Sequence, residues 1–108
     1  KALQELGEAL QINKTLHTLK IGYNHLEDDD IKFVTTALCS NNSIQTLFLG
    51  HNNVSRLASE CLGEMLRKNN TIINLNLTTM GLNQEKGLTI AQALRHNRGI
   101  TSLDFSYN

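Results

Sequence analysis

Four consecutive carboxylates at residues 27–30 are the first group of side chains that could do chemistry. Carboxylate oxygens are preferred ligands of Ca²⁺, but a calcium loop alternates its ligands with other residues and closes with a distal glutamate. This run shows neither the spacing nor the closing glutamate. Negative side chains also stabilise the start of a helix through its dipole. The run therefore predicts a helix N-terminus and no metal site.

Four histidines, His17, His25, His51 and His96, are the next candidates for catalysis or metal binding. No two of them are four residues apart, which is the helical spacing of a zinc pair, and no nucleophile motif accompanies them. The seven glycines are dispersed, so there is no glycine-rich loop to cradle a phosphate. We therefore predict no catalytic residue, no metal site, no cofactor and no small-molecule substrate.

The cysteine and charge content narrows the class of protein further. Cys39 and Cys61 form neither a disulfide framework nor a zinc motif, which predicts two reduced thiols packed on helices. Ten basic and ten acidic residues cancel, which argues against the positive field that attracts nucleic acid or anionic lipid. There is no membrane-spanning apolar run, and no signal-peptide pattern opens the sequence. These features predict a cytoplasmic protein that binds neither nucleic acid nor membrane.

The elements that must position these residues follow from an internal repeat. The segments 15–24, 43–52, 71–80 and 99–108 align without gaps. Three aligned positions are apolar in every copy: Leu16, Ile44, Ile72 and Ile100; Leu19, Leu47, Leu75 and Leu103; and Ile21, Leu49, Leu77 and Phe105. We expect each segment to form a strand, and the stacked units to bury these positions in one core.

Between these segments, apolar residues recur at intervals of three and four, which is the spacing of one helix face. The aligned residues are Leu6, Val34, Leu62 and Ile90; Leu10, Leu38, Leu66 and Leu94; and Ala9, Ala37, Met65 and Ala93. An asparagine follows each stretch, at positions 13, 41, 69 and 97. Asparagine tolerates the left-handed backbone that commonly ends a helix. The sequence therefore predicts a helix after every strand, closed by an asparagine cap.

The pattern L-x-x-L-x-L-x-x-N in a 28-residue strand–helix unit resembles the leucine-rich repeat, and its helical second half resembles the ribonuclease-inhibitor subclass. That subclass also includes the sensor end of NOD-like receptors, Ran GTPase-activating proteins and the C-terminal part of tropomodulin. The resemblance covers essentially the whole chain. It implies a single domain, 1–108, with a partial repeat 1–14, repeats 15–42, 43–70 and 71–98, and a partial repeat 99–108, as in an interior slice of a longer array.

The resemblance implies an α/β fold, namely a leucine-rich repeat solenoid that coils as a curved right-handed β-α superhelix. Its parallel β-sheet would line the concave face and its helices the convex face, because helices need about 10 Å of width and strands about 4.8 Å. In this family an asparagine ends each strand motif and ties neighbouring backbones together. Asn24, Asn52 and Asn108 match, but Met80 does not, so we expect the turn around Met80 to be rearranged.

Side chains alternate along a strand, so the residues between the buried positions would face outward on the concave side. Most of them are small and neutral. The candidate partner-binding residues are Lys20, Tyr23, Phe48, His51, Asn76, Asp104 and Tyr107. Aromatic anchors often dominate interface energy, whereas isolated exposed apolar residues are common on any surface. The sequence therefore leaves open whether Phe48 anchors a partner or is an ordinary isolated exposed residue, and whether the tyrosines bind a partner or pack on neighbouring repeats.

These expectations favour a non-enzymatic scaffold that binds a protein partner on its concave face. One alternative is a GTPase-activating or regulatory accessory of the Ran GTPase-activating type, in which Arg56 would be the functional arginine. The plainer interpretation of Arg56 is a solvated side chain at a helix start. The other alternative is a structural component of a large cytoskeletal or ciliary assembly. In that case the outer helices would make the contacts.

Overall fold

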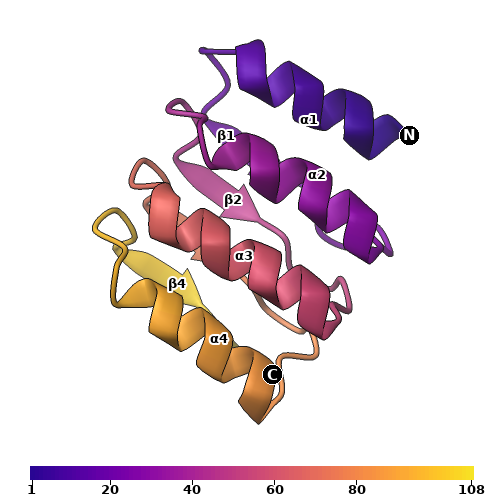
Figure 1. The fold of residues 1–108 in the computed structure, drawn as a ribbon, viewed down its shortest axis with the longest axis vertical. Helices are drawn as coiled ribbons and strands as arrows, with labels where there is room; N and C mark the ends of the chain where they lie inside the picture. The colour runs from indigo at the N-terminus through magenta and orange to yellow at the C-terminus, as the bar shows by residue number, and fades with distance from the viewer.

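The computed structural model describes residues 1–108 as four helices and four strands in strict alternation (Figure 1). The helices are α1 (Ala2–Ile12), α2 (Asp28–Leu38), α3 (Arg56–Lys68) and α4 (Gln84–Leu94). The strands are β1 (Thr18–Lys20), β2 (Thr46–Phe48), β3 (Asn74–Asn76) and β4 (Ser102–Asp104). Because each strand has only three residues, the sheet is a narrow ribbon against which the longer helices pack.

The strands form one parallel sheet in the order β1-β2-β3-β4. Each strand pairs with the next in the register of the sequence repeat, so that Leu19, Leu47, Leu75 and Leu103 lie side by side. The four helices form a single layer on one side of the sheet (Figure 1). The apolar side chain at the centre of each strand points towards this layer, and the residues on either side of it point to the face that no helix covers.

The core lies between the sheet and the helix layer and contains 22 buried apolar residues. Leu47 of β2, Leu49 just after β2, and Leu62 of α3 are fully buried. Burying a leucine side chain contributes roughly 1.5–3 kcal/mol, so the aligned apolar positions hold the strands and helices together. The core thins at the two ends of the sheet, where a strand has a neighbour on one side only.

The helix starts follow from local capping. The acidic run begins α2, where the N–H of Glu27 donates to Asp30 Oδ2 at 3.0 Å in a capping box, so the prediction of a helix N-terminus there is confirmed. Ser55 caps α3 by accepting from the N–H of Ala58. Asn83 caps α4 in the same way. Each cap satisfies an N–H group that has no partner within its own helix.

The asparagines that follow the helices do not adopt the predicted left-handed backbone. Asn13 and Asn69 are extended, with φ of −67° and −91°, so that prediction is wrong. The column instead links neighbouring layers. Asn41 Nδ2 donates to the carbonyl of Leu10, at the end of the preceding helix, at 2.9 Å, while its Oδ1 accepts two N–H groups of the following turn. Asn69 and Asn97 repeat this arrangement on α2 and α3.

The turn around Met80 is rearranged, as the missing asparagine predicts. In the first layer, Asn52 Oδ1 accepts from the N–H of Leu26 at 2.9 Å. One layer further on, the side chain of Met80 cannot accept such a bond, and its backbone carbonyl accepts from the N–H of Val54 at 3.1 Å instead. The Met80 side chain is fully buried in the core. The main-chain carbonyl of Met80 therefore accepts the hydrogen bond that an asparagine amide accepts in the other layer, and the apolar side chain of Met80 fills the core instead.

The predicted curved, superhelical solenoid is wrong. The molecule measures 35 × 30 × 18 Å and has a radius of gyration of 12.3 Å. This radius is close to the value of about 13 Å that is typical of a compact domain of this length. Four layers with three-residue strands are too few and too short for a superhelical coil to develop. The fold is a compact α/β domain with one parallel sheet and one layer of helices.

Candidate functional site

The last residue of each strand contributes to one row across the uncovered face of the sheet. Lys20, Phe48, Asn76 and Asp104 are neighbours in this row. Together with residues beside them they line a shallow hollow of about 360 Å³. Lys20 and Asp104 are exposed at its two ends, and Phe48 is half-buried between them. The structure thus brings four of the seven predicted partner-binding residues together.

Phe48 is half-buried because it lies over two glycines of its own sheet. A Cβ placed on Gly50 would lie 2.6 Å from Phe48 Cε1, and one on Gly22 would lie 3.0 Å from the same ring. Tyr23 adds an edge-to-face contact, with the ring centroids 6.3 Å apart. Phe48 therefore packs within the sheet, with only part of its ring facing outward.

Tyr23 and His51 form a pair at the rim of the sheet. Their rings stack with centroids 3.9 Å apart, and Tyr23 Oη lies 2.8 Å from His51 Nε2. Both residues have left-handed backbone, with φ of 59° and 63°, and so do Thr79 and Tyr107 at the same place in later layers. This conformation lets the N–H of Tyr23 donate to the carbonyl of Gly50 at 3.1 Å. Tyr23 thus packs on the next repeat, which is one of the two alternatives that the sequence left open for the tyrosines.

Asn76 and Asp104 each form hydrogen bonds within their own turns. Asn76 Oδ1 accepts from both the hydroxyl and the N–H of Thr78. Asp104 does the same with Ser106, and these two hydrogen bonds lower the pKa of the Asp104 carboxyl. Tyr107 is 87% exposed and does not line the hollow.

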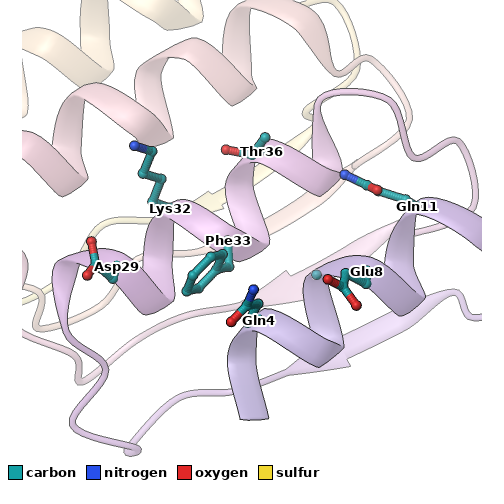
Figure 2. A pocket seen from close by; sticks show the side chains of 8 residues that line it. Gln4, Glu8, Gln11, Asp29, Lys32, Phe33 and Thr36 are labelled. Carbon is teal, nitrogen blue, oxygen red and sulfur yellow. The ribbon is translucent and has the colours of Figure 1, made fainter. Parts of the chain in front are cut away.

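The helix layer carries a second hollow, between α1 and α2 (Figure 2). It has a volume of about 410 Å³ and is lined by polar side chains around Phe33. The two helices approach closely here, because a Cβ on Gly7 would lie 2.8 Å from the carbonyl oxygen of Phe33. Phe33, Leu57 and Leu88 are 36%, 53% and 57% exposed, one on each of α2, α3 and α4. The sequence reasoning missed them, because they lie outside the aligned apolar columns on which it was based.

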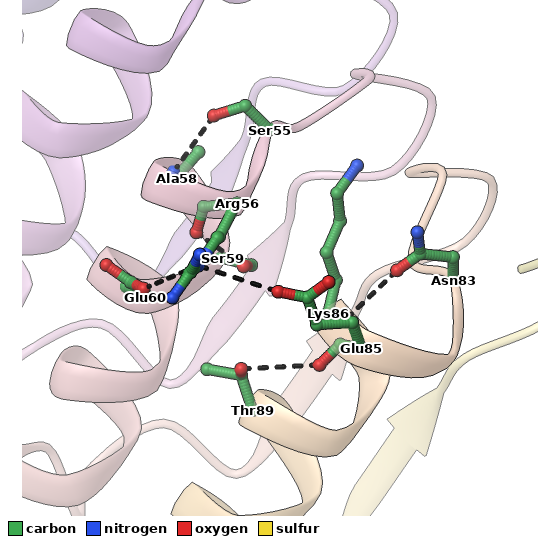
Figure 3. A network of polar contacts seen from close by, with 9 residues as sticks. All are labelled: Ser55, Arg56, Ala58, Ser59, Glu60, Asn83, Glu85, Lys86 and Thr89. Carbon is green, nitrogen blue, oxygen red and sulfur yellow. Dashed lines mark hydrogen bonds and ion pairs between the residues drawn. The ribbon is translucent and has the colours of Figure 1, made fainter.

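Arg56 is engaged with carboxylates of two helices. Its Nε lies 3.2 Å from Glu60 Oε1 on α3 and 3.5 Å from Glu85 Oε1 on α4 (Figure 3). The arginine therefore links neighbouring helices on an exposed surface, where such pairs contribute little stability. Its charge is already matched by two carboxylates, which leaves no structural support for a GTPase-activating arginine.

The remaining reactive groups form no further site. The structure contains no group of three His, Cys, Asp or Glu side chains placed to hold a metal ion. Cys39 and Cys61 are free thiols, and partial burial raises the pKa of both. None of the helices is long and apolar enough to cross a bilayer.

Comparison with known proteins gives matches among solved structures only. No family model and no curated protein matches this chain. A structure titled leiomodin-1 actin-binding site 2 matches with a TM-score of 0.89 and 20% identity, over 99% of this chain and 63% of that one. The tropomodulin C-terminal domain from Caenorhabditis elegans matches with a TM-score of 0.80 and 15% identity, over 97% of this chain and 65% of that one. The chain thus spans less than two thirds of either structure, and at these identities the likeness shows the fold alone.

These matches correct the family assignment. The chain is similar in fold to the leiomodin and tropomodulin domains, so its assignment to the ribonuclease-inhibitor-like leucine-rich repeat proteins is wrong, and so is the extended solenoid. The 28-residue repeat specifies a strand–helix unit and the register in which the strands pair, and both a compact domain and an extended solenoid can be built from such units. The repeat does not specify the curvature of the sheet or the identity of a partner. The predicted general scaffold with a partner on a concave face rested on that assignment and is wrong with it.

Proposed function

We propose that this chain is a non-enzymatic, cytoskeletal actin-binding domain. The observation that carries the proposal is the agreement of its fold with leiomodin-1 actin-binding site 2, over 99% of the chain at a TM-score of 0.89. The proposal corresponds to the cytoskeletal alternative that the sequence left open. A domain of this kind acts by complementarity of shape and side chains, and it needs no catalytic group or cofactor.

The outer face of the helices is the surface that we assign to actin. Phe33, Leu57 and Leu88 place one exposed apolar side chain on each of three consecutive helices. Protein interfaces commonly have an apolar centre that includes aromatic side chains, within a polar rim. The hollow beside Phe33 supplies such a rim, with Gln4 and Glu8 on α1 and Lys32 on α2 (Figure 2).

The uncovered sheet face is the competing surface. Its most central apolar residue, Phe48, is half-buried over glycines, and its aromatic pair at the rim, Tyr23 and His51, is already satisfied internally. Tyr23 and Tyr107 nevertheless have 66% and 87% of their surface exposed on this side, so the sheet face is a real competitor of the helix layer. The seven sheet-face residues stay a prediction as partner contacts, and the binding assay compares the two faces directly.

The test is co-sedimentation of the purified chain with filaments of purified actin. We expect saturable recovery in the pellet. The double variant Phe33→Ala/Leu57→Ala should weaken binding at least about fivefold, because each interface anchor typically contributes more than about 1 kcal/mol. Tyr23→Ala on the sheet rim is the matched control and should bind like the unchanged chain.

Two outcomes would contradict the account at different levels. If the unchanged chain binds neither actin filaments nor actin monomers, the proposed function is wrong. If it binds and Tyr23→Ala alone weakens binding, the function stands and the assignment to the helix face is wrong.

A further inference from the structure

Exposed cations gather where the last two helices end. The net charge of the chain is zero, but the acidic run at residues 27–30 lies at the start of α2. Residues 65–84 and 87–103, which contain the ends of α3 and α4, include no Asp or Glu. The Lys and Arg side chains of these two segments, all of them exposed, are Arg67, Lys68, Arg95 and Arg98. We call these four residues the basic edge.

The basic edge extends over two neighbouring layers on one side of the molecule. The four helices lie side by side and run in the same direction, so that their ends fall together (Figure 1). The turns after α3 and α4 are joined directly, because the N–H of Arg98 donates to Asn70 Oδ1 at 2.8 Å. Arg67 and Arg95 occupy the same place in the repeat, on packed helices whose axes typically lie about 8–10 Å apart.

Three of these cations have no anionic partner. The Nζ of Lys68 lies 3.1 Å from Glu64 Oε1, but no carboxylate lies within 4.0 Å of the other three guanidinium groups. Carboxylates at the helix starts do not neutralise them. A helix of 13 residues, such as α3, spans about 20 Å, which exceeds the screening length of about 8 Å at physiological ionic strength. The basic edge therefore keeps its positive charge.

The arginines of the basic edge are not needed to close the helices. Cations near a helix end often stabilise it by bonding its last carbonyls. Here the asparagine column supplies that bond, since Asn97 Nδ2 donates to the carbonyl of Leu66, near the end of α3, at 2.9 Å. The one hydrogen bond made by an arginine side chain is that of Arg56 with Glu60, at the other end of α3. The arginines at the helix ends are thus available to a partner.

The exposure of the basic edge belongs to positions of the repeat. Arg67 is exposed although α4 packs against α3 on the far side. The place that Arg98 takes in the last layer is also exposed in the inner layers, where Asn42 and Asn70 occupy it. These positions therefore lie on the flank of the stack, where a neighbouring layer does not cover them.

We propose that the basic edge binds an acidic segment of another protein. Alternate side chains of an extended segment point to the same side and lie about 6.6–6.8 Å apart. Two carboxylates separated by one residue can therefore reach Arg67 and Arg95 together, and the planar guanidinium of arginine pairs with a carboxylate through two parallel hydrogen bonds. The zero net charge of the chain favours a protein segment over nucleic acid or a bilayer, which attract proteins through a broad positive field. This inference does not rest on the proposed actin binding.

The test is fluorescence anisotropy of a labelled synthetic peptide in which glutamate alternates with serine, titrated with the chain. We expect saturable binding that weakens as salt is added. Arg67→Glu/Arg95→Glu should weaken binding at least about tenfold, because two attractive contacts become repulsive. Lys14→Glu/Lys20→Glu is the matched control, since both lysines are exposed and the net charge changes equally. This control should bind within about twofold of the unchanged chain, because distant charges are screened.

Circular dichroism verifies that both double variants are folded, and the same peptide with glutamine in place of glutamate should not bind. A glutamate peptide that does not bind, or a glutamine peptide that binds equally well, would overturn the proposal. Equal weakening by the two double variants would overturn the location of the site. Vesicles containing anionic lipid and single-stranded DNA serve as competitors, and displacement of the peptide by either at an equal concentration of negative charge would overturn the assignment to a protein segment.

Discussion

The side-chain oxygen of Asn52 accepts a hydrogen bond from the N–H of Leu26, 2.9 Å away in the preceding layer. The amide nitrogen of Asn52 donates to the carbonyls of Leu49 at 2.7 Å and Ile21 at 3.2 Å. One fully buried side chain therefore joins two turns that are far apart in the sequence. Buried polar groups that lose such a partner are costly, so Asn52 should contribute strongly to stability.

Replacing Asn52 tests this arrangement. Asn52→Leu keeps a similar volume but leaves several buried backbone groups without partners. We expect a loss of about 3 kcal/mol in the free energy of unfolding, measured by urea denaturation. Asn24→Leu is the control, because Asn24 is exposed, and it should cost less than about 1 kcal/mol. Equal losses for the two variants would contradict a special role for the buried amide.

Restoring the missing asparagine should not stabilise the fold. Met80 is fully buried, and its carbonyl already accepts from the N–H of Val54. Met80→Asn would lose roughly 1.5–3 kcal/mol of apolar burial and gain at most about 1.5 kcal/mol from new hydrogen bonds. We expect a net loss of about 1 kcal/mol by thermal and urea unfolding. Met80→Leu should change stability by less than about 1.5 kcal/mol, and a more stable Met80→Asn would refute the account.

The packing of Phe48 over glycine predicts coupling between two sites. A methyl group on Gly50 would lie 2.6 Å from the Phe48 ring, so Gly50→Ala should destabilise the domain by about 1–3 kcal/mol. In Phe48→Ala that collision is absent, although the same methyl group would still lie 2.9 Å from Asn76 Oδ1 and 3.0 Å from the carbonyl oxygen of Thr78. The double variant should therefore lose about 1 kcal/mol less stability than the sum of the losses of the two single variants. Additive effects would mean that the ring does not lie over this glycine.

The thiols should be slow to alkylate. Burial raises the pKa of Cys39 and Cys61, so less of each is the reactive thiolate at neutral pH. We expect iodoacetamide to modify both more slowly in the folded chain than in urea, with the difference narrowing at alkaline pH. Because the folded pKa is raised, the associated stability is present below the unfolded pKa of about 8.5 and is lost as the pH rises through the folded value. Alkylation at equal rates in both states would contradict this.

Much of the local structure could be predicted from the spacing of apolar residues. Leu19, Leu47 and Leu75 share a position in the repeat, and stacking them is the arrangement that buries all three. The overall shape could not be predicted in this way, because curvature depends on how many layers accumulate and how long their strands are. The role of Asn41 was also missed, since its partner, the carbonyl of Leu10, lies 31 residues away.

The candidate binding surfaces could be predicted only in part from the sequence. Strand alternation placed Lys20, Phe48 and Asp104 in one outward row, but it gave no information on how much of each side chain is exposed. Phe33 and Leu57 on the helix face were missed, because a search for helix-period columns selects the residues that are buried. Their exposure follows from tertiary packing, which sets how closely α1, α2 and α3 approach one another.

The most direct test of actin binding through the helix face is an NMR titration of the ¹⁵N-labelled chain with monomeric actin. The account predicts that backbone amide signals on the outer sides of α1, α2 and α3, around Phe33 and Leu57, shift or broaden, while those of the sheet rim around Tyr23 stay in place. A spectrum that is unchanged at every amide with actin in excess would contradict the central claim.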